Sequence, residues 1–172
     1  MSVKIIGVGK ALPRKKILNS ELPEELNTSD EWIRSHTGIG SRYICSENEN
    51  SAVLGVKAAE AALANAKSNG FFVNSEQIDL IVCSTAVPVH WGFPSNACLI
   101  QQSLCADNAA GFDVSAACSG FIYGLQTGRA LLNQMNWKYA LVIGTEELSR
   151  IVNWKDRSSC ILFGDGAGAV LL

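Results

Sequence analysis

The stretch Phe112-Asp113-Val114-Ser115-Ala116-Ala117-Cys118-Ser119-Gly120-Phe121 decides where this chain places its chemistry. The apolar residues of a strand are followed by a cysteine, and small residues then open a helix. The unpaired N–H groups at a helix N-terminus carry partial positive charge, which favours a thiolate at that place. Small neighbours also leave room for a substrate to reach the sulfur of Cys118. The pattern is typical of a strand and helix that present a nucleophile.

Cys118 is one of six cysteines, and most free cysteines in proteins are small buried hydrophobic residues. Cys83 and Cys160 lie inside apolar runs, and we interpret them as core residues. The chain has no CxxC pair and no cysteine–histidine cluster with zinc-ligand spacing, so we expect no structural metal site. Unclustered cysteines favour a reducing cytoplasm over a disulfide framework. Context alone therefore singles out Cys118.

The composition predicts one domain that covers residues 1–172. Hydrophobic residues make up 48% and charged residues 17%, which argues against disorder. Because the formal net charge is only −2, we expect no attraction to nucleic acid or to an anionic membrane. Residues 1–9 lack the pattern of a signal peptide, and no apolar run reaches the ~20 residues that span a bilayer. We therefore expect a cytoplasmic protein.

Strand and helix patterns alternate along the chain and predict the α/β class. The predicted strands are the apolar runs at residues 3–8, 79–84, 112–116, 139–144, 159–163 and 167–172. The predicted helices cover residues 51–63, 96–104 and 121–135. We expect Ser51 to cap the first helix and Gly164-Asp165-Gly166 to join the last two runs as a hairpin. Residues 20–50 are polar and predict a long excursion with a helical turn or two. The whole order implies a mixed five-stranded sheet with helices on both faces.

Four blocks of the sequence follow one another at spacings that one enzyme family shares. They are Thr28-Ser29-Asp30-Glu31-Trp32-Ile33 with Thr37-Gly38-Ile39, then Phe93-Pro94-Ser95-Asn96-Ala97-Cys98, then residues 113–121, and then Phe163-Gly164-Asp165-Gly166-Ala167-Gly168-Ala169. Together they resemble the β-ketoacyl-acyl-carrier-protein synthase III family, thiolase-fold condensing enzymes that start fatty-acid synthesis. The resemblance covers nearly the whole chain and implies the N-terminal half of the thiolase-like fold.

The resemblance implies a role for five residues. Cys118 would take an acyl group from acyl-CoA as a thioester, and its own backbone N–H would contribute to the oxyanion hole. Trp32 and Arg157 would sandwich the CoA adenine, and Thr28 would form a hydrogen bond near it. Phe93 would shape the acyl pocket across the interface of a homodimer. The resemblance further implies acyl-CoA as a substrate, no cofactor, and an acyl-carrier protein as a partner.

The chain departs from the family pattern in three ways. His36 stands where the family often has an arginine close to the CoA phosphates, and a basic residue would also be usual at Gly40. The loop around residues 89–92 is one residue longer than in typical members. The histidine and asparagine that assist decarboxylation lie in the second half of the family fold, outside this sequence. His36 and His90 match neither of them, and we interpret both as ordinary loop histidines.

Other interpretations remain open from the residues alone. Trp32 could pack locally, Arg157 could pair with Asp156, and Phe93 could belong to the core. The chain could be a non-catalytic partner that binds CoA, or part of a secondary-metabolite condensing enzyme with the same nucleophile. A cysteine hydrolase is rejected, because Ala116 replaces the glycine that its motif requires and no histidine follows Cys118.

Overall fold

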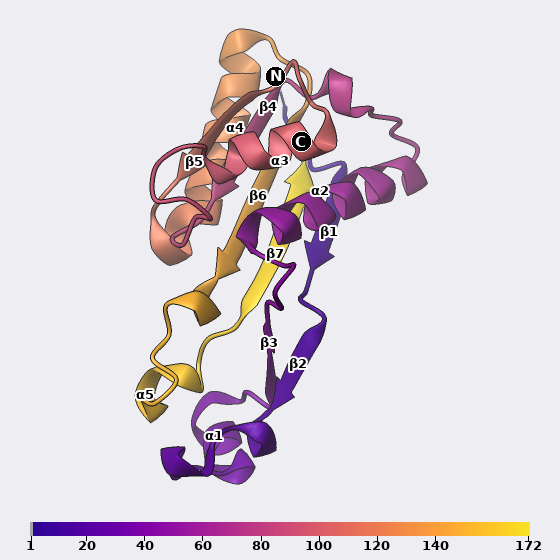
Figure 1. Cartoon of the computed structure of the whole chain (residues 1–172). Helices are drawn as coiled ribbons and strands as arrows, with labels where there is room; N and C mark the ends of the chain where they lie inside the picture. Colours follow the sequence, from indigo (N-terminus) through magenta and orange to yellow (C-terminus); the bar gives the residue numbers. More distant parts are fainter. Residues whose placement is uncertain (1) are drawn as a thin grey trace.

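The computed structural model describes residues 2–172 and consists of an α/β body with a smaller lobe at one end (Figure 1). The body contains the strands β1 (Gly7–Ala11), β4 (Leu80–Ser84), β5 (Ala110–Val114), β6 (Ala140–Glu147) and β7 (Asp165–Leu171) and the helices α2 (Ser51–Ser68), α3 (Asn96–Leu104) and α4 (Gly120–Met135). The lobe contains β2 (Lys15–Leu18), β3 (Ser41–Ile44), α1 (Asp30–Thr37) and α5 (Arg157–Cys160). In Figure 1 the body lies above and the lobe below.

The body is built on a sheet with the strand order β1-β7-β6-β4-β5. Strand β4 pairs in parallel with both β5 and β6, whereas β7 runs antiparallel to β6 and to β1. The predicted mixed five-stranded sheet is therefore confirmed. The central strand β4 is buried along its whole length, which explains why its sequence is apolar on both faces.

The two faces of the sheet are covered by different helices. Side chains alternate across a strand, so Ile81 and Cys83 belong to the core that includes α2 and α3, while Leu80 and Val82 pack against α4. The prediction of helices on both faces is confirmed, and Figure 1 shows α2 and α3 on one side of the strands and α4 on the other.

Helix α2 lies against the sheet with almost no side-chain layer between them. A Cβ atom on Gly9 would lie 2.1 Å from the carbonyl oxygen of Ala58, so only glycine allows this approach of β1 to α2. The Asn50 side chain accepts a hydrogen bond from the N–H of Val53 at the start of α2. The predicted Ser51 cap is therefore wrong by one residue, and the Ser51 hydroxyl instead donates to the carbonyl of Val87.

The lobe was predicted only as a polar excursion with a helical turn or two. It is a two-stranded antiparallel sheet of β2 and β3 with α1 and α5 beside it. The lobe has a small apolar core of its own, formed by Leu26, Ile33, Cys160 and Ile161. The two strands were not predicted, because each is four residues long and rich in polar side chains.

The predicted hairpin at residues 159–172 is wrong. Residues 157–160 form α5, whose start is capped by the Asp156 carboxylate accepting from the N–H of Ser158. Only the second apolar run is a strand, and β7 pairs with β6 and β1 rather than with the residues before it. The first predicted strand, at 3–8, also shifts, because β1 begins at Gly7. The apolar run at 159–163 begins in the last residues of α5 and continues into the turn after it, so an apolar run alone does not define a strand.

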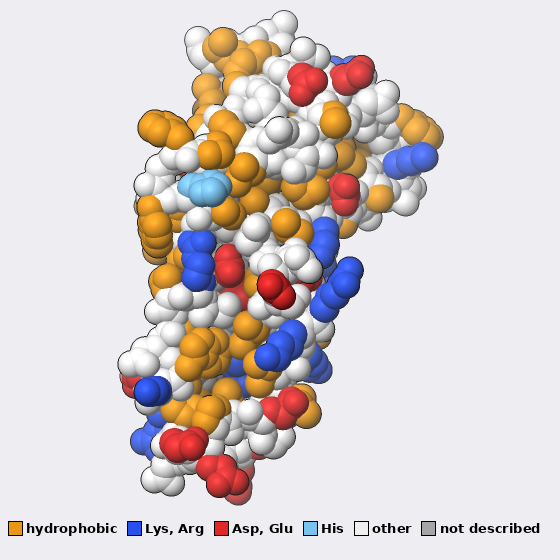
Figure 2. All heavy atoms as spheres, viewed as in Figure 1, with side chains coloured by type: hydrophobic (Ala, Val, Ile, Leu, Met, Phe, Trp, Pro, Cys, Tyr) orange, Lys and Arg blue, Asp and Glu red, His pale blue; other side chains and the backbone are white. Residues whose placement is uncertain are grey.

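No helix within residues 2–172 is both long enough and apolar enough to cross a membrane. On the face shown in Figure 2, acidic side chains gather at the end of the molecule where Figure 1 shows α1.

Candidate active site

Cys118 lies between the end of β5 and the start of α4. It occupies a 3-10 turn, Ala117–Ser119, that leads directly into α4 at Gly120. Ala117 has a φ of 47°, in the left-handed region that side-chain-bearing residues rarely adopt. Such a conformation costs on the order of 1–3 kcal/mol and is often found at functional sites. The Cys118 side chain is exposed, as the predicted nucleophile requires.

Helix α4 lies close to the sheet directly behind Cys118. A Cβ atom on Gly124 would lie 2.8 Å from the hydroxyl of Ser84. That hydroxyl donates to the carbonyl oxygen of Gly120 over 2.8 Å, which ties the first turn of α4 to the end of β4. The position of the Cys118 turn above the sheet is therefore fixed by the contacts of the Ser84 side chain with Gly120 and Gly124.

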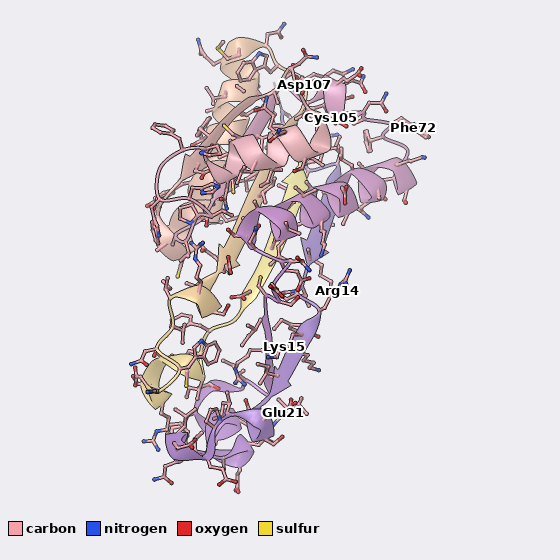
Figure 3. The ribbon with its side chains drawn as sticks, in the orientation of Figure 1. Arg14, Lys15, Glu21, Phe72, Cys105 and Asp107 are labelled. Carbon is pink, nitrogen blue, oxygen red and sulfur yellow. The ribbon has the colours of Figure 1, made fainter. Side chains whose placement is uncertain are left out.

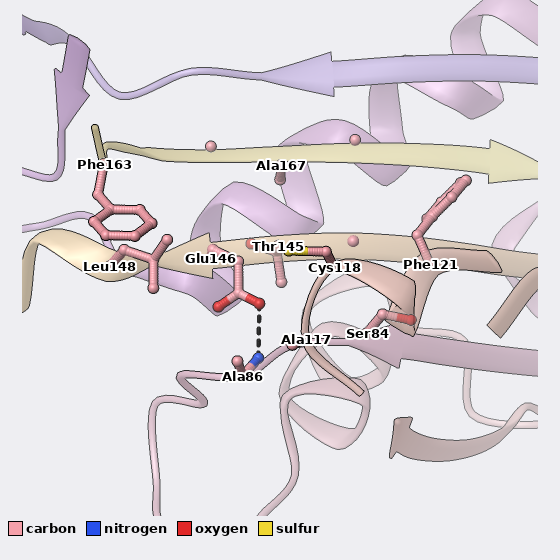
Figure 4. Close-up of a pocket in the computed structure, with 13 residues that line it drawn as sticks. Ser84, Ala86, Ala117, Cys118, Phe121, Thr145, Glu146, Leu148, Phe163 and Ala167 are labelled. Atoms are coloured by element: carbon pink, nitrogen blue, oxygen red, sulfur yellow. Dashed lines mark hydrogen bonds between the residues drawn. The ribbon is translucent and has the colours of Figure 1, made fainter. Parts of the chain in front are cut away.

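A cavity of about 490 Å³ opens beside Cys118 (Figure 4). The ends of β4, β6 and β7 and the first turn of α4 line it, and its surface is mostly apolar. Phe121 and Phe163 lie at opposite ends of the lining drawn in Figure 4, with Cys118 and Thr145 between them. We call this space the Cys118 cavity. It is large enough for a small acyl group and keeps an apolar environment around the sulfur.

Glu146 is a lining residue of the Cys118 cavity that was not predicted. Its carboxylate accepts hydrogen bonds from the backbone N–H groups of Ala86, over 2.7 Å, and Val87, over 3.1 Å. Burial raises the pKa of the Glu146 carboxyl, while these hydrogen bonds oppose the rise. A carboxylate at the end of the mainly apolar strand β6 was the only sign in the sequence that Glu146 is special. The residues that bind it lie about 60 positions earlier, so no local pattern could predict the contact.

The structure brings Trp32 and Arg157 into direct contact, although they lie far apart in the sequence. The guanidinium carbon of Arg157 lies 4.9 Å from the centroid of the Trp32 ring. We call these two residues the Trp32–Arg157 pair. Two stacking contacts of ~3.5–4 Å are needed to place a base between them, so the two groups must separate to form the predicted sandwich.

Two further groups surround the Trp32–Arg157 pair. Arg157 donates a hydrogen bond to the carbonyl oxygen of Asn27 over 2.8 Å. The neighbouring Thr28 hydroxyl is buried and has no hydrogen-bond partner within residues 2–172. A buried hydroxyl without a hydrogen-bond partner is unfavourable. Thr28 therefore has an unused hydrogen-bonding group close to the Trp32–Arg157 pair, where the family resemblance predicts a hydrogen bond to CoA. The alternative pairing of Arg157 with Asp156 is not an ion pair in the described part of the chain.

His36 is part of α1, so the interpretation of it as a loop histidine is wrong. Its ring stacks on Trp32 with centroids 4.1 Å apart and an angle of 22° between the planes. Its Nδ1 atom lies 2.8 Å from the Trp32 carbonyl oxygen and 3.0 Å from the Ser35 hydroxyl. The imidazole is thus held against the indole by its own helix. His90 does lie in a loop, where it lines a smaller cavity.

Phe93 does not line the Cys118 cavity of its own chain. Its side chain is 97% exposed, which contradicts the alternative that it belongs to the core. It lies next to an apolar hollow of about 600 Å³ along β5, the last strand of the sheet, which Phe112 also lines. The role of Phe93 across a dimer interface stays a prediction.

The other cysteines differ from Cys118 in their surroundings. Cys83 and Cys160 are buried, as predicted, and burial raises the pKa of both thiols. Burial also raises the pKa of Cys45, and the nearby Asp165 carboxylate adds to this effect. Cys98 and Cys105 are exposed but lie outside the Cys118 cavity. Within residues 2–172, no three histidine, cysteine or acidic side chains are arranged to hold a metal ion.

Known proteins match both the sequence and the fold. The model of the 3-oxoacyl-[acyl-carrier-protein (ACP)] synthase III family matches residues 112–172, which include Cys118. The β-ketoacyl-[acyl-carrier-protein] synthase III of Clostridium perfringens SM101 is 50% identical over 171 residues, which are 99% of this chain and 51% of that protein. The Bacillus pumilus protein of the same name is 45% identical over 172 residues, which are 100% of this chain and 53% of that protein.

Solved structures agree with these sequence matches. The 3-oxoacyl-[acyl-carrier-protein] synthase III of Aquifex aeolicus superimposes with a TM-score of 0.91 at 45% identity, covering 99% of this chain and 53% of that one. The priming β-ketosynthase of the R1128 polyketide pathway superimposes with a TM-score of 0.90 at 38% identity, covering 98% of this chain and 48% of that one. The chain spans about half the length of the curated relatives it matches. By sequence and by fold, it belongs to the β-ketoacyl-[acyl-carrier-protein] synthase III family.

Proposed function

We propose that this chain provides the acyl-accepting part of an acyltransferase that initiates fatty-acid synthesis. The observation that carries the proposal is the position of Cys118, exposed in an apolar cavity at the start of α4. The five other cysteines are either buried in the core or outside the cavity. Relatives of 45–50% identity bear the name of β-ketoacyl-[acyl-carrier-protein] synthase III, which supports this reaction class.

The proposed first step is a thioester exchange. The Cys118 sulfur, as a thiolate, attacks the carbonyl carbon of acyl-CoA and forms a tetrahedral intermediate. The carbon–sulfur bond to CoA then breaks, the acyl group stays on Cys118, and the CoA thiolate leaves and takes up a proton. The backbone N–H of Cys118 would stabilise the oxygen charge of the intermediate. The left-handed conformation of Ala117 sets the orientation of this turn.

The proposed CoA site is the Trp32–Arg157 pair with Thr28. Indole and guanidinium groups both stack on flat aromatic rings. The Thr28 hydroxyl, which has no partner among residues 2–172, would bond a ring nitrogen once the pair separates and uncovers it. Arg157 begins the segment that continues to Phe163 in the lining of the Cys118 cavity. One bound molecule could thus contact the lobe with its nucleotide and the cavity with its acyl group.

The second step would be decarboxylative condensation with a malonyl group on acyl-carrier protein. The histidine and asparagine that this step needs would come from residues outside these 172, in a part of the family fold that the chain does not span. We therefore propose acyl-carrier protein as a partner of the complete enzyme, with no cofactor beyond its thioester substrates, and the cytoplasm as its location.

A homodimer is proposed to complete the acyl pocket. Strand β5 is an edge of the sheet, and an unpaired edge readily pairs with another strand. The 97% exposed Phe93 and the apolar hollow along β5 lie on the same side of the molecule, which favours burial against a second copy. Light scattering at micromolar concentration should give twice the monomer mass, and a Phe93→Asp variant should shift the protein towards monomer. A monomeric wild type would rule out the proposed dimer.

Intact-mass spectrometry after incubation with acetyl-CoA tests the acyl transfer. The protein should gain the mass of one acetyl group, and a Cys118→Ala variant should gain none. A Cys105→Ala variant is the matched control, because Cys105 is also exposed but lies outside the cavity, and it should be acylated as fully as the wild type. A wild type that stays unmodified would favour a non-catalytic CoA-binding partner instead.

A second candidate function is priming of a secondary-metabolite pathway. It is favoured by the structural match to a polyketide priming ketosynthase at 38% identity. The nucleophile and the first step would be the same, and only the acyl group or the acceptor would differ. Acylation assays with a series of acyl-CoA donors distinguish the two, since a preference for acetyl-CoA supports fatty-acid initiation and a preference for bulkier groups supports the alternative.

A further inference from the structure

Two buried polar residues, Arg42 and Asn19, lie in the lobe that carries the Trp32–Arg157 pair. Arg42 comes from β3 and Asn19 follows β2, and their side chains are 5% and 4% exposed. The Nη2 atom of Arg42 donates to the Oδ1 atom of Asn19 over 2.6 Å. Neither residue lines the Cys118 cavity.

Asn19 holds helix α1 at both of its ends. Its Nδ2 atom donates to the carboxylate of Asp30, over 2.8 Å, and to the carbonyl oxygen of Ile39, over 2.7 Å. Asp30 is the first residue of α1, and Ile39 follows the last turn. Since Trp32 lies in the first turn of this helix, these contacts constrain the position of its backbone relative to Asn19.

Arg42 extends the same network to α5. Its Nη2 atom also donates to the carbonyl oxygen of Ile161, over 3.2 Å, at the end of the helix that Arg157 begins. One guanidinium nitrogen therefore links the two elements that carry the Trp32–Arg157 pair. The apolar contacts between Ile33 and Cys160 hold the same elements together, but apolar contacts are not directional, whereas hydrogen bonds are.

The guanidinium of Arg42 is poorly suited to stability alone. Its Nε and Nη1 atoms are buried and have no hydrogen-bond partner within the described residues. No carboxylate forms an ion pair with it among residues 2–172, and burial lowers its pKa. Replacing buried charges by apolar groups of similar volume is often neutral or stabilising. What an apolar residue could not supply is the directed link to Asn19 and to Ile161.

We propose that Arg42, acting through Asn19, is a positioning residue that sets the spacing between Trp32 and Arg157 and so the affinity for the nucleotide end of acyl-CoA. This inference rests on the proposed function of the Trp32–Arg157 pair. It predicts that Arg42 matters only for acyl donors that carry the adenine nucleotide. Donors that end at the phosphopantetheine arm reach Cys118 without using the lobe.

The test compares acylation of Cys118 by acetyl-CoA and by acetyl-phosphopantetheine in the complete protein. The Arg42→Met variant keeps the volume and removes both links. Its KM for acetyl-CoA should rise roughly tenfold, because a small misplacement of binding groups has effects of this order. The maximal rate with acetyl-CoA and all constants for acetyl-phosphopantetheine should stay within about twofold of the wild type.

Further variants keep the result clear if Arg42→Met is poorly folded. Arg42→Lys retains the charge but lacks the planar fork, and Asn19→Ala removes the link to α1 while leaving Ile161 bound. Both should raise the KM for acetyl-CoA alone. Lys16→Met is the matched control, since it removes a positive charge from an exposed position of the same lobe. It should leave the kinetic constants for both donors unchanged.

The outcomes separate the inference from the proposed function. If both donors lose rate together in the Arg42 and Asn19 variants, the two residues are merely structural and the inference is overturned. If the variants keep the wild-type KM for acetyl-CoA, it is overturned as well. If a Trp32→Ala variant also leaves that KM unchanged, the nucleotide site itself is wrong. If Cys118 of the wild type accepts no acetyl group from either donor, the whole proposed function is wrong.

Discussion

The Cys118 cavity and the Trp32–Arg157 pair are built from different kinds of structure. The cavity is walled by the ends of strands in the sheet and by a 16-residue helix, and two apolar clusters on the faces of the sheet support them. The pair lies on a lobe with four-residue strands and only a few buried apolar side chains. The position of Cys118 is thus supported by packing, whereas the proposed nucleotide site depends on a small number of hydrogen bonds.

The α/β body, which holds the cavity, and the lobe, which holds the pair, meet at a joint formed by Arg14, Ser46 and Glu49. Arg14 and Lys15 lie on the segment that leaves the body for the lobe, as Figure 3 shows. Beside it, the Glu49 carboxylate accepts hydrogen bonds from the backbone N–H of Arg14, over 3.2 Å, and from the hydroxyl of Ser46, over 2.7 Å. The comparison predicts that a change at Cys118 affects acylation alone, that changes in the packing of the body or at the joint affect stability, and that changes in the lobe affect binding of the acyl donor.

The largest expected effect is a Cys118→Ala substitution, which should abolish acylation and leave the free energy of unfolding within about 0.5 kcal/mol of the wild type. The side chain is exposed and supports no core contact, so its removal costs little packing. Intact mass and urea denaturation measure the two quantities. A large loss of stability would mean that the nucleophile also supports the fold.

A Gly9→Ala substitution should reduce stability, in contrast to Cys118→Ala. It should destabilise the body by about 3 kcal/mol or more, because its Cβ would lie 2.1 Å from the Ala58 carbonyl oxygen. The matched control is Gly166→Ala, where the nearest atom, on Leu12, is 3.5 Å from the new Cβ. Urea denaturation measures both variants. Equal stability of the two would contradict the close packing of β1 on α2.

A Glu49→Gln substitution should destabilise the protein by about 1–3 kcal/mol near neutral pH. The hydrogen bond from Ser46, assisted by the Arg14 N–H and by Lys57, lowers the pKa of Glu49 to about 2 from its ordinary 4.5. Its ionised form therefore stabilises the fold above about pH 4.5, and this contribution is lost as the pH falls through about 2.

Urea denaturation across this pH range measures the Glu49 contribution. The difference between the wild type and Glu49→Gln should be full near neutral pH and should vanish near pH 2. The exposed Glu60 serves as the control, since Glu60→Gln should give no such dependence. A difference that persists unchanged at the lowest pH would contradict the role of the ionised carboxylate.

The smallest expected effect belongs to the lobe, where Trp32→Ala should raise the KM for acetyl-CoA roughly tenfold, equivalent to about 1.4 kcal/mol, with little change in the maximal rate of acylation. Phe72→Ala, which removes an aromatic ring exposed to 72% after α2, is the control. Steady-state kinetics with varied acetyl-CoA measure both. A fall in the maximal rate with unchanged KM would place Trp32 in the chemistry rather than in binding.

The sequence was informative where one element carries its own signal. The apolar run at 79–84 and the helix at 96–104 are visible from periodicity, and α3 has the predicted bounds. The predicted nucleophile, Cys118, stood out for the same reason, since the strand, the cysteine and the helix start are contiguous. Contact between Trp32 and Arg157 came only through the family resemblance.

Much of what holds the site together was beyond the sequence because the partners are distant along the chain. Arg42 reaches Ile161, and Glu146 reaches Ala86, through contacts that no local pattern records. The β2–β3 pair was missed because its strands are short and polar. Residues 159–163 were mistaken for a strand because they form an apolar run, although the run begins inside α5 and continues into the turn after it. Tertiary contacts decided each of these elements.

The close seat of α4 on the sheet has a consequence for how this protein can diversify. Because Gly124 rests on Ser84 and the first turn is tied to β4, the depth of the sulfur does not depend on the large side chains around it. Phe163, which lines the cavity but is outside the apolar clusters of the body, can therefore be exchanged to widen or narrow the cavity while the Cys118 sulfur stays where it is. The volume of the cavity can in this way change independently of the position of Cys118, which makes the cavity a suitable target for redesign.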